Sequence, residues 1–197
     1  MLIGKIVKSN SHTDYVCQVY GSGEVAQPPA REDYGFGTFV RIELDKYRWL
    51  VGIIYDTQLV NPDFGRLGPR LSPQSELAVF SPDYLNEKAT LVGIAAIGAM
   101  STAGQVFQGV PDLATSADAL VEWMTEDQVR AFHQRNPALQ LAYAPLLLAQ
   151  GSPLALHLLR KVVGRLVAFF PEHTAMLSVL RANLEWKAQV GPLGGAL

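Results

Sequence analysis

Residues 38–56 read TFVRIELDKYRWLVGIIYD, and this stretch decides the fold class. Two runs rich in β-branched and aromatic residues, 38–44 and 49–56, flank the turn-forming residues Asp45, Lys46 and Tyr47. Such runs around a short polar turn are typical of a β-hairpin. Partial alternation of apolar and polar side chains within them indicates that one face of the hairpin packs inward and the other is wetter. The stretch therefore predicts an antiparallel hairpin.

The same texture extends through the amino-terminal half of the chain. Segments 2–7 and 15–19 flank the polar stretch 9–14 and predict a second hairpin. Segments 77–80 and 90–97 supply the last strands. The second of these is followed closely by Gly98 and contains Gly93, which predicts a strand approached closely by other backbone. Together these segments predict a closed β-barrel of five to six strands.

Turn residues dominate two connections between the predicted strands. Segment 57–75 is an excursion that we treat as a candidate binding loop, because functional loops often leave a rigid scaffold in this way. Residues 35–37 read GFG, which superficially resembles a phosphate-binding loop. They lack the third glycine and the following helix that such a loop requires, so we expect a tight turn.

After Gly104 the pattern becomes helical. Helices are predicted over 117–124 and 126–135, the second capped by Thr125 with Gln128 in a capping box. Two more are predicted to begin at the capping residues and prolines 136–137 and 152–153, with Pro145 dividing the first. A final helix over 172–190 places four apolar side chains on one face: Met176, Leu177, Leu180 and Leu184.

These elements predict an α+β protein with a small closed β-barrel over 1–104, a helical region over 105–190 and a flexible tail over 191–197. Its 16 basic and 18 acidic residues give a formal net charge of −2, which offers no overall attraction to nucleic acid or an anionic membrane. Cys17 is alone and cannot form an internal disulfide, so we expect a cytoplasmic protein. The longest apolar stretch, 91–100, is half the ~20 residues of a membrane helix, so no membrane span is expected.

Catalytic and cofactor motifs are not recognisable. No lysine lies in a glycine-rich nucleotide-binding loop, and the four histidines are too scattered for a zinc site. Ser101 and His133 have no feature that brings them together as nucleophile and base. We therefore expect no cofactor, no metal and no enzyme activity, with a shallow catalytic site in segment 57–75 as the alternative.

Segment 153–170 is the most informative part of the helical region. Apolar side chains surround nearly its whole circumference, leaving a narrow polar stripe. That stripe holds His157, Arg160, Lys161 and Arg165. One interpretation is a central bundle helix with a solvated edge. The other is a partner-facing helix whose cations meet acidic side chains or phosphate.

The amino-terminal half resembles a known family. Residues 3–7 read IGKIV, 34–42 read YGFGTFVRI, 50–56 read LVGIIYD and 91–94 read LVGI. This succession of short strands resembles the HAS-barrel family, found at the amino terminus of HerA-type DNA-translocating ATPases and of F-type ATP synthase subunits. The resemblance implies a barrel that assembles or docks, with chemistry left to a following ATPase domain that is replaced by helices here.

The expected function is therefore a non-catalytic adaptor that acts by protein–protein contact or self-association through the barrel and the apolar helices. The alternative is an accessory subunit of a HerA-type DNA translocase or repair complex, contacting DNA directly through Arg160, Lys161 and Arg165.

Overall fold

The computed structural model describes residues 1–61, 89–135, 138–149 and 152–190. Three predictions fall wholly or largely outside these residues: the strand over 77–80, most of the excursion over 57–75 and the tail over 191–197.

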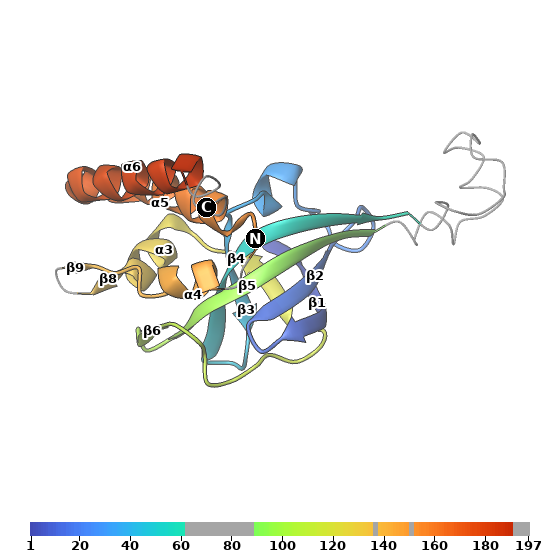
Figure 1. Ribbon diagram of the computed structural model, residues 1–197. Helices are drawn as coiled ribbons and strands as arrows, with labels where there is room; N and C mark the ends of the chain where they lie inside the picture. Colours follow the sequence, from blue (N-terminus) through green and yellow to red (C-terminus); the bar gives the residue numbers. More distant parts are fainter. Residues whose placement is uncertain (62–88, 136–137, 150–151, 191–197) are drawn as a thin grey trace.

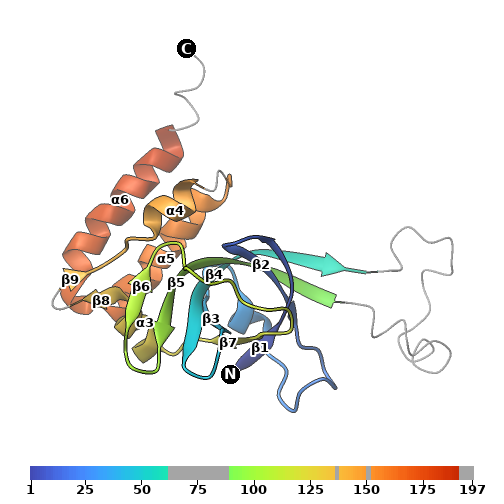
Figure 2. The ribbon, with the colours of Figure 1, turned by 90° about the horizontal axis from the view of Figure 1, so that it is seen from below.

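The amino-terminal part is a closed antiparallel barrel of six strands, as the sequence predicts. Its strands follow one another around the barrel in the order β2-β1-β7-β3-β4-β5, and pairing of β2 with β5 closes the ring (Figure 2). The strands are β1 (Leu2–Ser11), β2 (Asp14–Val19), β3 (Phe39–Glu43), β4 (Arg48–Val60), β5 (Ala89–Ser101) and β7 (Leu120–Trp123). With the helices that follow, the barrel confirms the α+β class.

Both predicted hairpins are present: β1 pairs with β2, and β3 pairs with β4. Ile6 of β1 lies opposite Cys17 of β2, and Val40 of β3 lies opposite Gly52 of β4. Alternate side chains of these strands point into the barrel and are removed from water. The barrel interior is an apolar cluster that includes Ile3, Ile6, Tyr15, Cys17, Val40, Ile42, Leu50, Ile54, Val92, Ile94 and Val121.

Close backbone approach is confirmed at β5. A Cβ atom added to Gly98 would lie 2.1 Å from the carbonyl oxygen of Phe107 in β6 (Val106–Gln108), the short strand that extends the sheet beyond β5. The corresponding distance at Gly4 of β1 is 1.9 Å, to the carbonyl oxygen of Gln18. Glycine therefore lets the neighbouring strand approach closely at both positions, because it has no side chain there.

The predicted helix over 117–124 is wrong. Residues Leu120–Trp123 form β7, which pairs with β1 on one side and β3 on the other. Val121 is fully buried in the barrel, and Glu122 forms an ion pair with Arg41 of β3. Pairing with β1 and β3 on both sides overrides the local helical preference of this segment. The barrel consequently uses residues beyond the expected boundary at 104.

The carboxy-terminal part is largely helical. The helices are α3 (Glu126–His133), α4 (Ala144–Ala149), α5 (Ala155–Phe169) and α6 (Thr174–Val190), with single turns η1 (Arg31–Tyr34) in the barrel part and η2 (Pro171–His173) before α6. The Thr125 capping box of α3 is confirmed, since the backbone N–H of Gln128 donates to Thr125 and that of Thr125 to the Gln128 side chain.

The predicted helix start at 136–137 lies outside the described residues. The residues on either side of it form two short paired strands, β8 (Gln134–Arg135) and β9 (Ala138–Leu139). Residues 138–143 are not helical, so the prediction is wrong over that described part. Pro145 accordingly lies in the first turn of α4 rather than dividing a longer helix. Proline is well tolerated at that place because its missing N–H would be unpaired there anyway.

The helices cover one side of the barrel, and α5 and α6 lie side by side (Figure 1). Barrel residues such as Phe39, Val51 and Ile53 belong to the same buried cluster as Val162 and Leu166 of α5. The Gln108 side chain ties β6 to the helices, donating to the carbonyl oxygens of Phe132 and Gln140. Barrel and helices therefore share one core.

Candidate functional site

Helix α5 has one buried face and one solvent face. The buried face packs on the barrel and α6 and comprises Ala155, Leu158, Leu159, Val162, Val163 and Leu166. The solvent face follows the helical repeat as His157, Arg160, Lys161, Gly164, Arg165 and Ala168. This arrangement fits the first interpretation, a buried helix with a solvated edge, while the second, a helix that meets a partner, stays a prediction.

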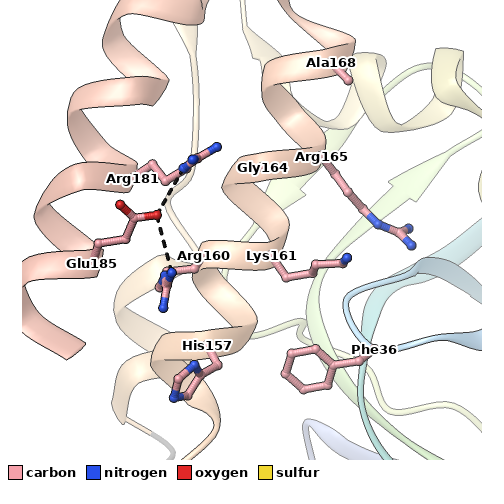
Figure 3. Close-up of a pocket in the computed structure, with 9 residues that line it drawn as sticks. All are labelled: Phe36, His157, Arg160, Lys161, Gly164, Arg165, Ala168, Arg181 and Glu185. Carbon is pink, nitrogen blue, oxygen red and sulfur yellow. Dashed lines mark hydrogen bonds and ion pairs between the residues drawn. The ribbon is translucent and has the colours of Figure 1, made fainter. Parts of the chain in front are cut away.

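The solvent face of α5 forms the floor of an open pocket of about 670 Å³, which we call the α5 groove. Phe36 of the barrel stands on one side of this floor, and Arg181 and Glu185 of α6 stand on the other (Figure 3). All four residues predicted as partner or anion contacts line it: His157, Arg160, Lys161 and Arg165. The structure brings these residues together, and their role as contacts stays a prediction.

Two of the groove's cations share one carboxylate on the α6 side. The guanidinium of Arg160 lies 3.4 Å from Oε1 of Glu185, and Nε of Arg181 lies 3.2 Å from the same oxygen. All three side chains are more than a third exposed, so each ion pair contributes little to stability. Their effect is to fix Arg160 and Arg181 at the rim of the groove.

The other two cations extend toward the barrel and have no carboxylate partner among the described residues. Arg165 donates to the Thr38 hydroxyl at 3.2 Å, and burial lowers the pKa of its guanidinium. Arginine nevertheless stays charged in proteins. The stem of Lys161 passes over Gly37, where a Cβ would lie 2.8 Å from its Cγ, and its ammonium group is exposed.

The GFG segment that borders the groove is a tight turn, as predicted. Gly37 has a φ of 80°, a left-handed conformation that favours glycine, and the Thr38 N–H donates to the carbonyl oxygen of Gly35. The turn places Phe36 against the groove and leaves room for the Lys161 stem.

The sequence did not point to five residues of the groove: Phe36, Gly164, Ala168, Arg181 and Glu185. The four-residue spacing of Arg181 and Glu185 is a signal for a solvated helix face and was available. Phe36 carried no signal, because only the fold places the barrel turn beside α5.

A second exposed feature lies on α6. Leu177 and Leu184 are buried, as predicted, whereas Met176 is 49% exposed and therefore does not belong to the inward face. Val179 and Trp186 are 64% and 63% exposed. Met176, Val179 and Trp186 are separated by three and seven residues, so they form one line along the helix, which we call the α6 stripe.

His133 is a core residue rather than a catalytic base. It is fully buried, with one ring nitrogen 2.8 Å from the carbonyl oxygen of Val129 and the other 2.7 Å from the Tyr143 hydroxyl. The rings of Phe39, Phe132 and Phe170 surround it. Burial lowers its pKa to about 4. It is therefore neutral at pH 7.

Aromatic and basic side chains lie close together on the barrel around Trp49, but the arginines among them form ion pairs. Arg41 is paired with Glu122 and lies over the Trp49 ring, Arg48 is paired with Asp45, and Phe39 is buried. Stacking on nucleic-acid bases requires exposed aromatics beside free cations, which this patch does not offer.

Within the described ranges, no cluster of three or more His, Cys, Asp or Glu side chains has the arrangement of a metal site. No described helix has the length and apolar character needed to span a membrane.

A family model matches residues 1–193, which include both the barrel and the helices with their groove. The chain belongs to the DUF8166 family. The description of this family is "Domain of unknown function (DUF8166)". None of the curated proteins compared with the chain matches it significantly. In this DUF8166 chain the barrel, α5 and α6 thus fall within one family unit.

Proposed function

We propose that this protein is a non-catalytic adaptor that works through protein–protein contacts, with the α6 stripe as a contact surface. The observation that carries the proposal is the exposure of Met176, Val179 and Trp186 along one line of a helix whose opposite apolar residues are already buried. Large apolar side chains aligned on one exposed face are typical of interaction sites, and tryptophan is prominent among residues that dominate binding energy.

The packing of α6 supports this role. Leu177 and Leu184 anchor the helix in the shared core, so the stripe stands on a fixed support. A rigid helix loses little conformational entropy when it binds, which favours its use as a docking element. If α6 packed only within this protein, its buried leucines would suffice and the exposed α6 stripe would have no structural role.

We assign the barrel to the HAS type and give it the role that this resemblance implies, attachment to a larger assembly. Closure of the six strands supports the assignment, because a closed barrel has no free sheet edge and offers rigid loops for docking. The lone Cys17, fully buried, fits a reducing cytoplasmic setting.

The proposal is tested with a Val179→Gln/Trp186→Gln double variant. Light scattering over a concentration series measures self-association, and a pull-down from the native cell measures partner capture. We expect wild-type protein to self-associate or to retain a defined partner, and the double variant to lose that association. Val7→Gln, which alters an exposed apolar side chain on β1, is the matched control. A lone wild-type monomer without a partner would contradict the proposal, as would equal association of all three proteins.

The second candidate function is that of an accessory subunit of a HerA-type DNA translocase or repair complex. Lys161 and Arg165 support it, since neither has a carboxylate partner in the described part of the chain and such cations can contact phosphate. Salt-dependent binding to a labelled duplex, lost when Arg160, Lys161 and Arg165 become alanine, is its expected signature. Flat binding curves at low salt would remove it.

A further inference from the structure

The α5 groove carries more positive charge than its surroundings neutralise. Among the residues that the structure describes, four cations line it against the single carboxylate of Glu185, which both Arg160 and Arg181 already contact. The whole chain carries a net charge of −2, so this excess is local. A local excess of cations in a concave site attracts an anionic ligand.

Gly164 gives an independent indication that the floor of the groove is kept open. It lies in the middle of α5, where glycine costs about 1 kcal/mol of helix stability relative to alanine. A Cβ at this position would meet no atom within 4 Å, so packing does not require the glycine. Gly164 lies one turn after Arg160 and directly before Arg165, so the floor of the groove carries no side chain beside these two cations.

The shape of the groove favours an extended chain over a compact ion. Its floor runs along α5 from His157 to Ala168, about 16 Å at the rise of an α-helix. Its cations Arg160, Lys161 and Arg165 lie beyond the first turn of α5, where the backbone N–H groups are bonded within the helix and cannot cradle a phosphate as a helix N-terminus does. The carboxylate of Glu185 lines the same groove and would face the phosphates of a nucleic acid, which favours a protein ligand over a duplex.

The spacing of Lys161 and Arg165 indicates which charged groups an extended ligand would present to them. Lys161 and Arg165 are one helical turn apart, which separates their Cβ atoms by about 5–6 Å. Alternate side chains of an extended strand point the same way at a spacing of about 6.6 Å. Carboxylates two residues apart therefore match the two cations, and Phe36 offers an apolar surface to a side chain beside them.

We propose that the α5 groove binds an extended acidic segment of a partner protein, with alternate carboxylates on Lys161 and Arg165 and an apolar side chain against Phe36. The partner's acidic side chains replace the missing counter-charges in the groove. The groove and the α6 stripe use different faces of α6, because Arg181 and Glu185 are out of helical phase with Val179 and Trp186. Binding at the groove can therefore be tested, and lost, independently of binding at the α6 stripe.

The probe is a short fluorescein-labelled peptide in which glutamate alternates with leucine, and its binding is measured by fluorescence anisotropy. A peptide with glutamine in place of glutamate is the matched control ligand. We expect saturable binding of the acidic peptide that weakens as salt is raised, and at least about tenfold weaker binding of the glutamine peptide.

Three variants locate the binding site. Gly164→Gln fills the floor without changing charge, and its gain in helix propensity keeps the chain folded. Lys161→Gln removes a free cation, whereas Lys187→Gln removes an exposed α6 lysine that does not line the groove. We expect about tenfold loss of affinity in the first two and wild-type affinity in the third. Circular dichroism confirms that all three are folded.

Four results would overturn the inference. These are no binding of the acidic peptide, binding of the glutamine peptide as tight as that of the acidic one, binding that Gly164→Gln leaves unchanged, and tighter binding of labelled oligothymidylate that the same two variants abolish. The last would identify the groove as a nucleic-acid site.

Discussion

At the scale of single residues, His133 shows how the fold makes a potentially reactive group structural. Its ring is held by hydrogen bonds to Val129 and Tyr143 inside a shell of phenylalanines. Such a site favours the neutral imidazole, because burying a charge there is costly.

This burial predicts a pH dependence of stability. The pKa of His133 is about 4 in the folded protein, below its ordinary value of 6.5 in an unfolded chain. The unfolded state therefore takes up a proton first as the pH falls. We expect the contribution of His133 to be fully present above pH 6.5 and to be lost between pH 6.5 and pH 4, on the order of 3 kcal/mol.

Urea unfolding at a series of pH values measures this effect. The His133→Phe variant is the control, since it has no titrating group at this position whatever its overall stability. Its free energy of unfolding is expected to change less between pH 6.5 and 4 than that of the wild type. Equal slopes for the two proteins would show that His133 is not the responsible group.

Two glycines provide a matched pair at the same scale. A Cβ at Gly4 would collide with the carbonyl oxygen of Gln18, whereas a Cβ at Gly164 would meet nothing. We expect Gly4→Ala to lower the free energy of unfolding by about 2–3 kcal/mol and Gly164→Ala to raise it by about 0.5–1 kcal/mol. Denaturant titration measures both. A loss of stability in Gly164→Ala would mean that the glycine is needed for packing rather than for an open groove.

At the scale of elements, local patterns predict hairpins and caps well and global closure poorly. The β3–β4 hairpin and the Thr125 capping box depend on neighbours in sequence, and both are confirmed. Strand β7 depends on an empty place between β1 and β3, which no local pattern records. The same distinction applies to the groove. Its cations on α5 follow the helical repeat and could be predicted, whereas only tertiary packing places Phe36, Arg181 and Glu185 beside them.

The pairing of α5 with α6 also predicts how the groove can be tuned. Glu185 is the only carboxylate that lines it in the described part of the chain, and it holds Arg160 and Arg181. Replacing it in Glu185→Gln frees both cations. We expect the acidic peptide to bind about fivefold more tightly.

The control for this change is Glu172→Gln, which breaks an exposed pair with Arg130 outside the groove. It is expected to leave peptide affinity unchanged. Weaker binding by Glu185→Gln would indicate that the ion pairs organise the site rather than compete with its ligand.

At the scale of the whole molecule, barrel and helices are joined by one buried cluster. Phe39 and Ile53 of the barrel pack with Val162 and Leu166 of α5, so neither part has a complete core alone. We therefore expect a single cooperative unfolding transition. Far-UV circular dichroism, which reports the helices, and tryptophan fluorescence, to which Trp49 and Trp123 of the barrel contribute, should give the same urea midpoint. Separate midpoints would show that the barrel and helices are independent units.

The central claim is that the face of α6 bearing Val179 and Trp186 meets another protein. Photo-crosslinking tests it most directly, with a benzoylphenylalanine introduced in turn at position 186 and, as a control, at position 7 of β1, in the cell that makes the protein. The account predicts a discrete crosslinked species of higher mass from position 186 and none from position 7. Equal crosslinking from both positions, or none from position 186, would contradict it.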